Sequence, residues 1–459
     1  MQLPEKLLES LEGIDGFDKE AFEKVHRGGG QLTSIRVNPL KSSDGKREMS
    51  MEDFFHDSRL KIHERVPWSR YGYYLVQRPS FTFDPLFHAG CYYVQEASSM
   101  FLEQALKQTV DLSRPLTILD LAAAPGGKST HIQSLISKDS LLVSNEVIRS
   151  RSNVLKDNII KWGCDNVVVT NDDPKEFARL ESHFDVIVVD APCSGSGLFR
   201  RDADAIGEWS ENNVQLCSQR QQRILAHVWP ALKKDGILIY STCSYSKEEN
   251  EEIVTWMNNN FSINICQLSI GKDWNIVESS SGYRFWPHKV KGEGFFLSCV
   301  KKMDAEVAAE IRVKKKIDLL NKREKGIVSK WINETDDELV KIQNTVNAIP
   351  GKLRNEINVL SSNLHVIYFG TIVGELVRDK LIPGHALAMS YLRGDGVERV
   401  EVNYDHAIDY LKKKELKNID VGTGWRLVSY KNYPLGWINA LPNRINNYYP
   451  KELRILKDI

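Results

Sequence analysis

The fold is decided by residues 118–130, ILDLAAAPGGKST, where an apolar strand-like segment runs into a turn of small residues and then into helix-forming residues. Apolar segments of the same kind recur along the chain, separated by stretches with helical spacing. Strands that alternate with helices predict an α/β fold built on a doubly wound parallel sheet. The expected strands are 116–121, 141–145, 167–170, 186–190 and 237–241, with 294–300 as a last strand.

The composition is that of a globular protein with no overall preference for a charged partner. The 459 residues are too many for one hydrophobic core and predict about two to four domains. Lysine and arginine together number 61, as do aspartate and glutamate, so any surface for nucleic acid must be local. No stretch approaches the roughly 20 apolar residues of a membrane span, and the charged N-terminus lacks the apolar core of a signal peptide. We therefore expect a cytoplasmic protein without a membrane partner.

Changes in composition along the chain suggest four regions. Residues 1–90 mix helix-like and strand-like pieces and predict a small α+β module, whereas residues 91–303 hold the alternating strands and helices. Residues 304–385 begin with a charged stretch that we expect to be helical, and they would link the core to a small β-rich domain at 386–459. A solvated helix face is the usual explanation of such a stretch, and contact with RNA is the alternative. Its basic residues are Arg312, Lys314, Lys315, Lys316, Lys322, Arg323, Lys325 and Lys330.

Two of the seven cysteines are expected to be functional. The seven are scattered, with no CxxC pair to indicate zinc or a redox motif, so we expect free thiols and no metal site. Cys217, Cys266 and Cys299 lie in apolar runs and are expected to be buried and inert. Cys193 and Cys243 each follow a predicted strand, and ligands of open α/β sheets bind outside the carboxyl ends of the strands. Both thiols would then face one crevice, which suggests covalent chemistry.

The turn after the first core strand is a candidate cofactor site. It consists of Ala122, Ala123, Ala124, Pro125, Gly126, Gly127 and Lys128. Small residues let a ligand approach the backbone, and the helix that follows offers unpaired N–H groups to a carboxylate. The glycine spacing matches neither a P-loop nor a dinucleotide fingerprint. Glu146, at the tip of the next strand, can bind ribose hydroxyls, and a polar group within 171–173 can bind an adenine amino group. These strand tips together make S-adenosylmethionine the best single cofactor.

Two thiols beside a sulfonium cofactor suit the methylation of cytosine at C5. This carbon is too weakly nucleophilic to take a methyl group directly, so a nucleophile must first add to C6, and a thiolate is the natural choice. A proton must then leave C5 and the thiolate must be eliminated. Asp190 is placed to hydrogen-bond the base edge and could also line the cofactor pocket. From the spacing alone, either Cys193 or Cys243 could be the attacking thiol.

Several motifs resemble those of the Nol/Nop/Sun family of RNA cytosine-5 methyltransferases. The most specific are the paired Pro-Cys and Thr-Cys motifs in 190–195 and 241–244, together with the turn at 119–128. Further matches lie at 93–100, 200–202, 219–222, 284–288 and 292–296, so that the resemblance covers about residues 36 to 300. It implies a Rossmann-like class I S-adenosylmethionine-dependent methyltransferase core.

The resemblance also assigns roles to residues. It implies that Cys243 is the nucleophile and that Cys193 assists release, whereas DNA cytosine-5 methyltransferases attack with the Pro-Cys thiol. At the adenine, Asp173 aligns better than Asp172. The implied cofactor contacts are Ala122, Ala123, Ala124, Pro125, Gly126, Gly127, Lys128, Glu146, Asp173 and Asp190.

The C-terminal region resembles the tail of bacterial RsmF-type enzymes, which modify 16S ribosomal RNA. Its signature comprises 381–385, 424–425, 435–437 and 443–450. The resemblance implies a PUA-like RNA-binding domain preceded by a small linking domain. Trp425, Trp437, Tyr448 and Tyr449 are expected in its core, because large aromatic side chains dominate the cores of small β domains.

The expected partner is therefore RNA, either 16S rRNA or the small ribosomal subunit, bound by a monomer without a DNA partner. A thiolate cannot reach C6 inside a duplex, so the target cytosine must be single-stranded, bulged or flipped. The modules on both sides of the core would select the RNA by its shape and phosphates. Candidate contacts are Arg149, Arg151, Arg200, Arg201 and the basic stretch 312–330.

Three alternatives stay open at the level of the sequence. The same fold could act on transfer RNA, since only the C-terminal resemblance favours the ribosome. A catalytically silent factor for ribosome assembly is disfavoured by the intact Cys193, Cys243, Asp190 and turn at 126–128. A small-molecule methyltransferase would need neither two thiols nor flanking RNA-binding modules.

Overall fold

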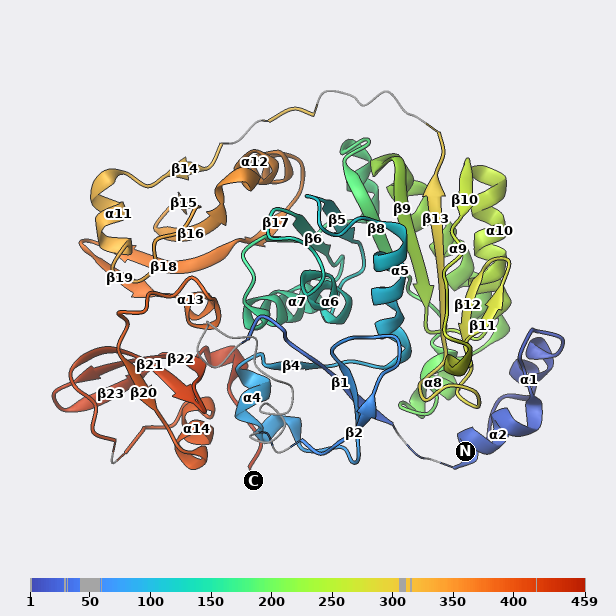
Figure 1. The fold of residues 1–459 in the computed structure, drawn as a ribbon, viewed down its shortest axis with the longest axis horizontal. Helices are drawn as coiled ribbons and strands as arrows, with labels where there is room; N and C mark the ends of the chain where they lie inside the picture. The colour runs from blue at the N-terminus through green and yellow to red at the C-terminus, as the bar shows by residue number, and fades with distance from the viewer. Residues whose placement is uncertain are drawn as a thin grey trace.

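A large central sheet and three smaller sheets make up the strand framework of the described residues (Figure 1). The computed structural model describes residues 2–28, 30, 32–41, 58, 60–304, 311–313, 316–417 and 419–458. The small sheets lie at the N-terminal end, in the region after the central sheet, and at the C-terminal end of the chain. The predicted succession of a mixed N-terminal part, an α/β core and a β-rich C-terminal part is therefore present.

The central sheet has ten strands. They are β5 (Thr117–Asp120), β6 (Leu141–Asn145), β7 (Val167–Thr170), β8 (Phe184–Asp190), β9 (Leu232–Thr242), β10 (Ile263–Ile265), β11 (Val277–Ser279), β12 (Gly282–Phe285), β13 (Phe295–Lys302) and β17 (Val366–Phe369). Their order is β11-β12-β13-β9-β8-β5-β6-β7-β17, with β10 paired to β13. Strands β5 to β9 pair in parallel, which confirms the predicted doubly wound α/β core. The chain order reverses at β5, between β6 and β8, so a ligand crevice is expected at the carboxyl ends of β5 and β8.

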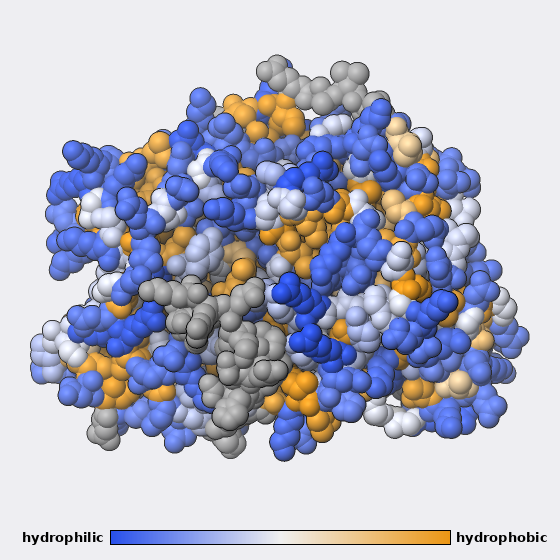
Figure 2. All heavy atoms as spheres, viewed as in Figure 1, coloured by the Kyte–Doolittle hydropathy of each residue, from blue (hydrophilic) through white to orange (hydrophobic). Residues whose placement is uncertain are grey.

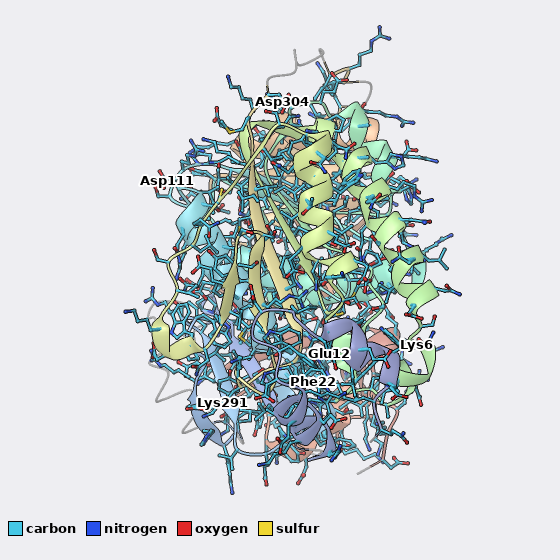
Figure 3. All side chains as sticks on the ribbon, turned by 90° about the vertical axis from the view of Figure 1, so that its right-hand side faces the viewer. Lys6, Glu12, Phe22, Asp111, Lys291 and Asp304 are labelled. Carbon is cyan, nitrogen blue, oxygen red and sulfur yellow. The ribbon has the colours of Figure 1, made fainter. Side chains whose placement is uncertain are left out.

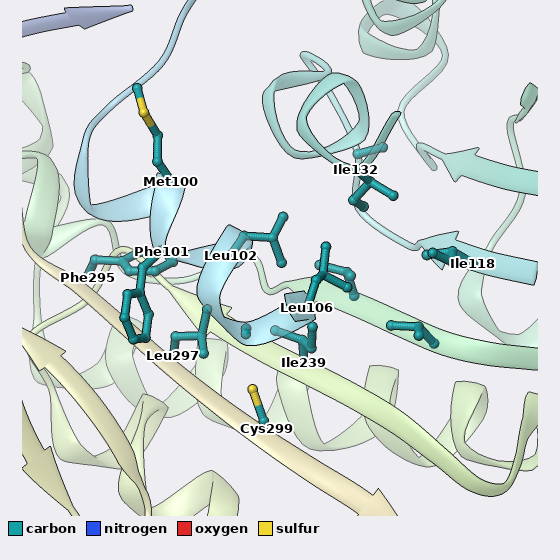
Figure 4. Packing of buried hydrophobic residues seen from close by; sticks show 14 of the residues in the cluster. Met100, Phe101, Leu102, Leu106, Ile118, Ile132, Ile239, Phe295, Leu297 and Cys299 are labelled. Carbon is teal, nitrogen blue, oxygen red and sulfur yellow. The ribbon is translucent and has the colours of Figure 1, made fainter. Parts of the chain in front are cut away.

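Helices cover both faces of the central sheet and bury two separate cores. They are α5 (Leu102–Thr109), α6 (Gly127–Gln133), α7 (Arg149–Trp162), α9 (Glu211–Val228), α10 (Glu251–Asn260) and α12 (Arg354–Asn363). Successive strand residues serve opposite faces, so that Ile118 joins the core under α5, α6 and α7 while Leu119 joins the core under α9, α10 and α12. Figure 4 shows Leu106 and Ile132 beside Ile118 in the first core. Because both faces are buried, strands such as β6, β7 and β8 are mostly apolar runs that can be recognised in the sequence.

The region after the central sheet contains less helix than we expected. Its elements, besides α12 and β17, are β14 (Asp318–Leu319), α11 (Lys322–Val328), β15 (Asp337–Ile342), β16 (Thr345–Pro350), β18 (Thr371–Val377), β19 (Lys380–Pro383) and α13 (His385–Met389). The prediction that the charged stretch is helical is confirmed only in part, because among the described residues of 304–330 only α11 is α-helical and β14 pairs with β15. Asn321 caps α11 in a capping box with Glu324, which starts the helix only after the strand. Lys314 and Lys315 lie outside the described residues.

This region is also attached to the central sheet. Strand β17 pairs antiparallel with β7 at the sheet edge, with Val366 opposite Thr170. Helix α12, which precedes β17, adds Ile357 and Leu360 to the core under α9 and α10. Residues assigned to a linking domain from the sequence thus complete one edge and one face of the central sheet.

The N-terminal and C-terminal sheets pack against each other. The N-terminal sheet contains β1 (Thr33–Val37), β2 (Ile62–Arg65), β3 (Gly72–Leu75) and β4 (Tyr92–Val94), and α4 (Pro85–His88) lies between β3 and β4 in the chain. The C-terminal sheet contains β20 (Arg399–Glu401), β21 (Gly424–Tyr430), β22 (Tyr433–Leu441) and β23 (Arg444–Asn447), with α14 (Tyr404–Leu411) beside it. Ile35 and Tyr92 share one buried cluster with Ile408 and Val428. The N-terminal and C-terminal sheets therefore share one hydrophobic core.

The first two helices lie at another place, beside the end of the central sheet. They are α1 (Glu5–Leu11) and α2 (Lys19–Arg27), and they lie close to the short helix α8 (Asp204–Glu208), as Figures 1 and 3 show. Phe22 packs edge-on against Tyr245, with ring centroids 4.9 Å apart, and both belong to a cluster that includes Trp286. This packing places the N-terminal helices against the segment that follows β9.

The surface gives no sign of a membrane-spanning part in the described residues. None of the helices that the structure describes is both long and apolar enough to cross a bilayer. The face in Figure 2 is mostly polar, with apolar side chains in scattered patches. The same described residues hold no group of three or more His, Cys, Asp or Glu side chains placed to bind a metal ion.

The aromatic residues of the C-terminal sheet divide between core and surface. Trp437 and Tyr449 are buried, as predicted. Tyr448 is 40% exposed, so the prediction is wrong there: it follows the edge strand β23 and contacts the half-buried Trp425 edge-on, with ring centroids 4.4 Å apart.

Candidate functional site

A pocket opens at the carboxyl ends of β5, β8 and β9, where the sheet topology places a ligand crevice. Its volume of roughly 360 Å³ is within the range of small-ligand sites. It brings together these residues singled out from the sequence: Ala122, Ala123, Ala124, Pro125, Gly127, Lys128, Asp190 and Cys243. Of the described residues, Gly126, Glu146, Asp173 and Cys193 are not part of the lining, although Glu146 and Cys193 contact residues that are.

The two cysteines at the strand ends are in direct contact. Strands β8 and β9 are neighbours in register, with Asp190 opposite Ser241, so the loops that follow them run side by side. The Sγ atoms of Cys193 and Cys243 lie 3.1 Å apart and form no disulfide. The hydrogen bond to Cys243 and burial both raise the pKa of Cys193 well above its usual value. The raised pKa favours the protonated form of Cys193, and either thiol can be the donor in this contact.

A buried carboxylate holds both cysteine loops. Glu249, in the short helical turn Lys247–Glu249, accepts hydrogen bonds from the Ser194 hydroxyl and the Ser244 hydroxyl, each at 2.6 Å. It also accepts the Ser194 backbone N–H at 2.8 Å. Asn250 then binds both neighbours of Cys243, since it accepts from the Thr242 hydroxyl at 2.5 Å and donates to the Ser244 carbonyl at 2.9 Å. The sulfur positions thus depend on two residues that sequence reasoning passed over.

Asp190 is held in the pocket by an ion pair. Its Oδ2 lies 2.8 Å from Lys128 Nζ, and its Oδ1 accepts a hydrogen bond from the Ser241 hydroxyl at 2.8 Å. Lys128 is almost buried, and its ammonium lies 5.3 Å from the ring centroid of Phe295. The pair joins the turn after β5 to the end of β8, and it leaves Asp190 facing the pocket as a hydrogen-bond acceptor.

The turn from Ala122 to Lys128 forms a close-fitting cradle. Gly126 has φ = +114°, a left-handed conformation that favours glycine, and it precedes the first residue of α6. A Cβ added to Gly127 would lie 3.4 Å from the Tyr93 ring, so a side chain there would press on the pocket wall. Beneath the turn, Asp120 accepts a hydrogen bond from the Ser129 hydroxyl at 2.6 Å, and burial raises the pKa of Asp120 to about 7. The small side chains of the turn leave space for a ligand to approach its backbone, which fits the cofactor-binding role that the sequence suggested.

The acids at the next two strand tips are placed differently from each other. Glu146, after β6, is buried, accepts the Ile148 backbone N–H at 2.9 Å and lies 3.5 Å from Arg151 of the pocket. Asp172 accepts hydrogen bonds from the His365 backbone N–H, the nearer at 2.9 Å. Asp173 is exposed and caps a short helical turn, Pro174–Arg179. Asp173 is therefore the freer of the two aspartates that the sequence left as alternatives.

Segments far apart in the sequence complete the pocket wall. Tyr93 lies in β4, Gln95 and Glu96 follow it, and Glu293 precedes β13. Both segments belong to motifs quoted for the family resemblance, but no local pattern shows that they face the site. The side chain of Glu293 is 4% exposed, and burial raises its pKa to about 7. Long-range packing alone reveals this acid as part of the site.

The arginines proposed as RNA contacts are not equivalent. Arg149 and Arg151 are exposed at the start of α7, and Arg201 lines the pocket. Arg200 is only 7% exposed at its side chain and donates to the carbonyl groups of Gly292 and Gly30 at 3.1 and 2.7 Å. It is therefore a structural cation within the protein rather than a surface contact.

Comparisons with known proteins agree over nearly the whole chain. Residues 107–301 match the family model described as 16S rRNA methyltransferase RsmB/F, residues 3–97 match the N-terminal domain of 16S rRNA methyltransferase RsmF, and residues 397–455 match the methyltransferase RsmF PUA domain. The ribosomal RNA small subunit methyltransferase F of Aeromonas salmonicida is 31% identical over 456 residues, which cover 92% of this chain and 90% of the relative. That of Psychromonas ingrahamii is 29% identical over 441 residues, covering 92% and 90%.

Solved structures share the central fold. A methyltransferase homologue from Pyrococcus horikoshii is 28% identical, with a TM-score of 0.51, and the match covers 66% of this chain and all of that one. NSun6 from the same organism is 21% identical, with a TM-score of 0.55 over 66% of this chain and 98% of its own, and it supports the fold. With the Rossmann-like core, the thiol pair and the relatives considered together, the chain belongs to the ribosomal RNA small subunit methyltransferase F (RsmF) family.

Proposed function

We propose that this protein methylates C5 of a cytosine in 16S ribosomal RNA, and that Cys243 forms a covalent bond to C6 of that cytosine. The observation that carries the proposal is the contact between Cys193 and Cys243 at 3.1 Å, beside the Asp190–Lys128 ion pair. Two thiols at one pocket match a reaction in which one sulfur must attack and later leave. Membership of the RsmF family supports the choice of ribosomal RNA.

The cofactor of the proposed reaction is S-adenosylmethionine. When bound, it supplies a methyl group on a sulfonium as the electrophile for C5. The residues that would hold it are the cradle at 122–128, with Glu146 for the ribose, Asp173 for the adenine and Asp190 at the pocket centre. Arg151 ties Glu146 to the cradle, because it also donates to the Ala124 carbonyl at 2.8 Å.

Cys243 is proposed as the nucleophile and Cys193 as the group that assists release. The thiolate of Cys243 adds to C6, and the electron pair of the C5–C6 double bond moves through C4 toward N3. The Cys193 thiol donates to the Cys243 sulfur and orients it. After C5 has received the methyl group, its proton leaves to a base, and the C6–S bond breaks with its electron pair returning to Cys243. The nearby Cys193 proton stabilises the departing thiolate, which lowers the barrier to elimination.

The rest of the chain is proposed to bind RNA. We assign residues 1–90 and 386–459 as RNA-binding modules, residues 91–303 as the catalytic domain and residues 304–385 as a linking domain. The matches to the RsmF N-terminal and PUA domain models support the two outer assignments. Arg149, Arg151 and Arg201 around the pocket are proposed to contact phosphates near a flipped cytosine. The free cysteines fit a cytoplasmic enzyme, since thiols persist in a reducing compartment.

The experiment that tests the proposal is bisulfite mapping of RNA from a strain that lacks the gene. The expected result is the loss of 5-methylcytosine at one or more positions of 16S rRNA, restored by the wild-type gene and not by the Cys243→Ala variant. Loss confined to transfer RNA would move the substrate to the alternative class. Unchanged 5-methylcytosine in both RNAs would overturn the proposed function.

A further inference from the structure

Glu293 is a buried acid in the pocket wall that the proposed mechanism does not yet use. Its side chain is 4% exposed and lines the same pocket as Cys243 and Asp190. Among the described residues, neither of its carboxyl oxygens has a hydrogen-bond partner, and the nearest charged contact is Arg200 Nη1 at 3.7 Å from Oε2. A buried polar group without a partner costs free energy, on the order of 1 to 3 kcal/mol, and such groups cluster where a ligand supplies the missing contact.

The backbone presents Glu293 rigidly. Its N–H donates to Glu96 Oε1 at 2.9 Å, and its carbonyl accepts from the Ser98 hydroxyl at 3.1 Å. The two flanking glycines are closely packed: a Cβ at Gly292 would lie 2.2 Å from Ser98 Oγ, and one at Gly294 would lie 2.3 Å from the Tyr245 ring. The hydrogen bonds and the packed glycines fix the backbone of Glu293, so its carboxyl group is preorganised to bind a ligand.

Burial and the surrounding charges allow the Glu293 carboxyl group to be protonated near pH 7. Arg200 and Arg201 favour the charged form, whereas Glu96 opposes it, and burial outweighs them so that the pKa rises to about 7. The other titratable groups of this pocket region, among the described residues, are Tyr245, Tyr93, Lys128, Arg151, Asp190 and Cys243. Glu293 can therefore donate an O–H near neutral pH.

Building on the proposed function, we propose that Glu293 recognises cytosine by donating its carboxyl proton to N3 and accepting a hydrogen bond from the N4 amino group. A neutral carboxyl matches this edge with one donor and one acceptor, while Asp190 offers a second acceptor. Uracil carries N3–H and O4 in these positions and presents the opposite pattern. A neutral carboxyl can present its donor and acceptor in either order, so the selection of the base depends on both acids. Asp190, in its ion pair with Lys128, can accept the second N4 proton of cytosine but would face the acceptor O4 of uracil.

The same contact also serves the chemistry. When the Cys243 thiolate adds to C6, the electron pair that moves through C4 arrives at N3. The proton passes from the Glu293 oxygen to N3, which leaves a carboxylate on Glu293 and a neutral pyrimidine adduct. When the C6–S bond breaks, N3 loses the proton and Glu293 regains it. No other reactant is required, so atoms and charges balance over the cycle.

The test compares wild type with the Glu293→Gln variant in single-turnover methyl transfer from pH 6 to 9. The substrate is small ribosomal subunits from a strain that lacks the gene. Glutamine can still donate to N3 but cannot give up a proton, so we expect a rate about 10 to 100 times lower at pH 6.5. The ratio of the two rates cancels the ionisation of Cys243, which both proteins share. We expect this ratio to be constant near pH 6 and to fall about tenfold per unit well above pH 7.

Two controls keep the outcomes apart. Glu278→Gln, at an exposed position on β11, should keep the wild-type rate and pH profile. The Glu293→Gln variant should keep wild-type S-adenosylmethionine binding and thermal midpoint.

A rate ratio that does not change between pH 6 and 9 overturns the inference, as does a wild-type rate in Glu293→Gln. If wild type itself transfers no methyl group to cytosine, the proposed function fails instead. If Glu293→Gln does not fold, the wild-type pH profile decides, because a uniform rise to pH 9 without a basic limb contradicts a required acid near 7.

Discussion

The sulfur atoms of Cys193 and Cys243 lie 3.1 Å apart because β8 and β9 are adjacent parallel strands whose ends are in register. The contact makes the two thiols chemically different. Cys193 is held in its protonated form by its partner and by burial, whereas Cys243 lines the pocket. One sulfur is thus exposed to the substrate, and the other is placed to act on it.

Replacing Cys243 by alanine should abolish methylation, because no thiolate remains to attack C6. The measurement is transfer of a labelled methyl group to small ribosomal subunits, together with a denaturing gel for the covalent enzyme–RNA adduct. Both signals should fall to background. The buried Cys299→Ala variant serves as the control and should still form the adduct. An undiminished adduct in Cys243→Ala would show that another residue attacks.

Replacing Cys193 by alanine should slow elimination more than attack, since the proton beside the leaving sulfur is lost. We expect an adduct that survives denaturation and accumulates, with turnover at least about tenfold lower. Adding Cys243→Ala to this variant should remove the adduct. Normal turnover in Cys193→Ala would mean that the contact between the thiols has no part in release.

Replacing Glu249 by alanine should release both cysteine loops, because this carboxylate binds Ser194 and Ser244 together. We expect methyl transfer to fall by roughly two orders of magnitude and unfolding to become easier by about 2 to 4 kcal/mol, as for loss of a buried hydrogen-bonded network. Glu249→Gln should recover part of both. The exposed Glu252→Gln is the matched control on the following helix. If Glu249→Ala keeps the wild-type rate, the loops hold their positions without it.

The contribution of buried histidines to stability should decrease as the pH falls from about 7 to 5, whereas the buried acids Asp120 and Glu293 contribute in the opposite direction. Burial lowers the pKa of His26 and of His131 to about 4, so these side chains stay neutral in the fold while the unfolded chain takes up protons near 6.5. A histidine with a lowered folded pKa stabilises the fold above its unfolded pKa, and this stability is lost as the pH falls toward the folded value. Each contributes on the order of 2 kcal/mol to the change.

Urea unfolding at pH 7 and pH 5 measures this dependence. Between pH 7 and pH 5, His26→Asn should lose about 2 kcal/mol less stability than wild type, whereas His63→Asn, at an exposed position, should behave as wild type. The same pH dependence in His26→Asn and wild type would mean that His26 takes up a proton without unfolding.

Local patterns were sufficient for the core of the fold. Strands β5 to β9 are buried on both faces, so each is an apolar run with small or polar residues at its end, and the five were found at nearly their observed positions. The turn at 122–128 and the two strand-end cysteines followed from the same pattern. The prediction for the charged stretch near 312–330 was only partly right, because composition does not distinguish a long helix from an edge strand followed by a short capped helix.

What the sequence determined by itself is the parallel sheet, the family, and the residues that end its strands. Only the tertiary structure decided that β17 closes the sheet, that Glu249 and Asn250 hold both cysteine loops, and that Glu293 lies buried in the pocket wall. The reason is physical. The position and the end of a strand depend on neighbouring residues in the sequence. The burial of a side chain and the hydrogen-bond partners of a carboxylate depend on segments that meet only when the chain has folded.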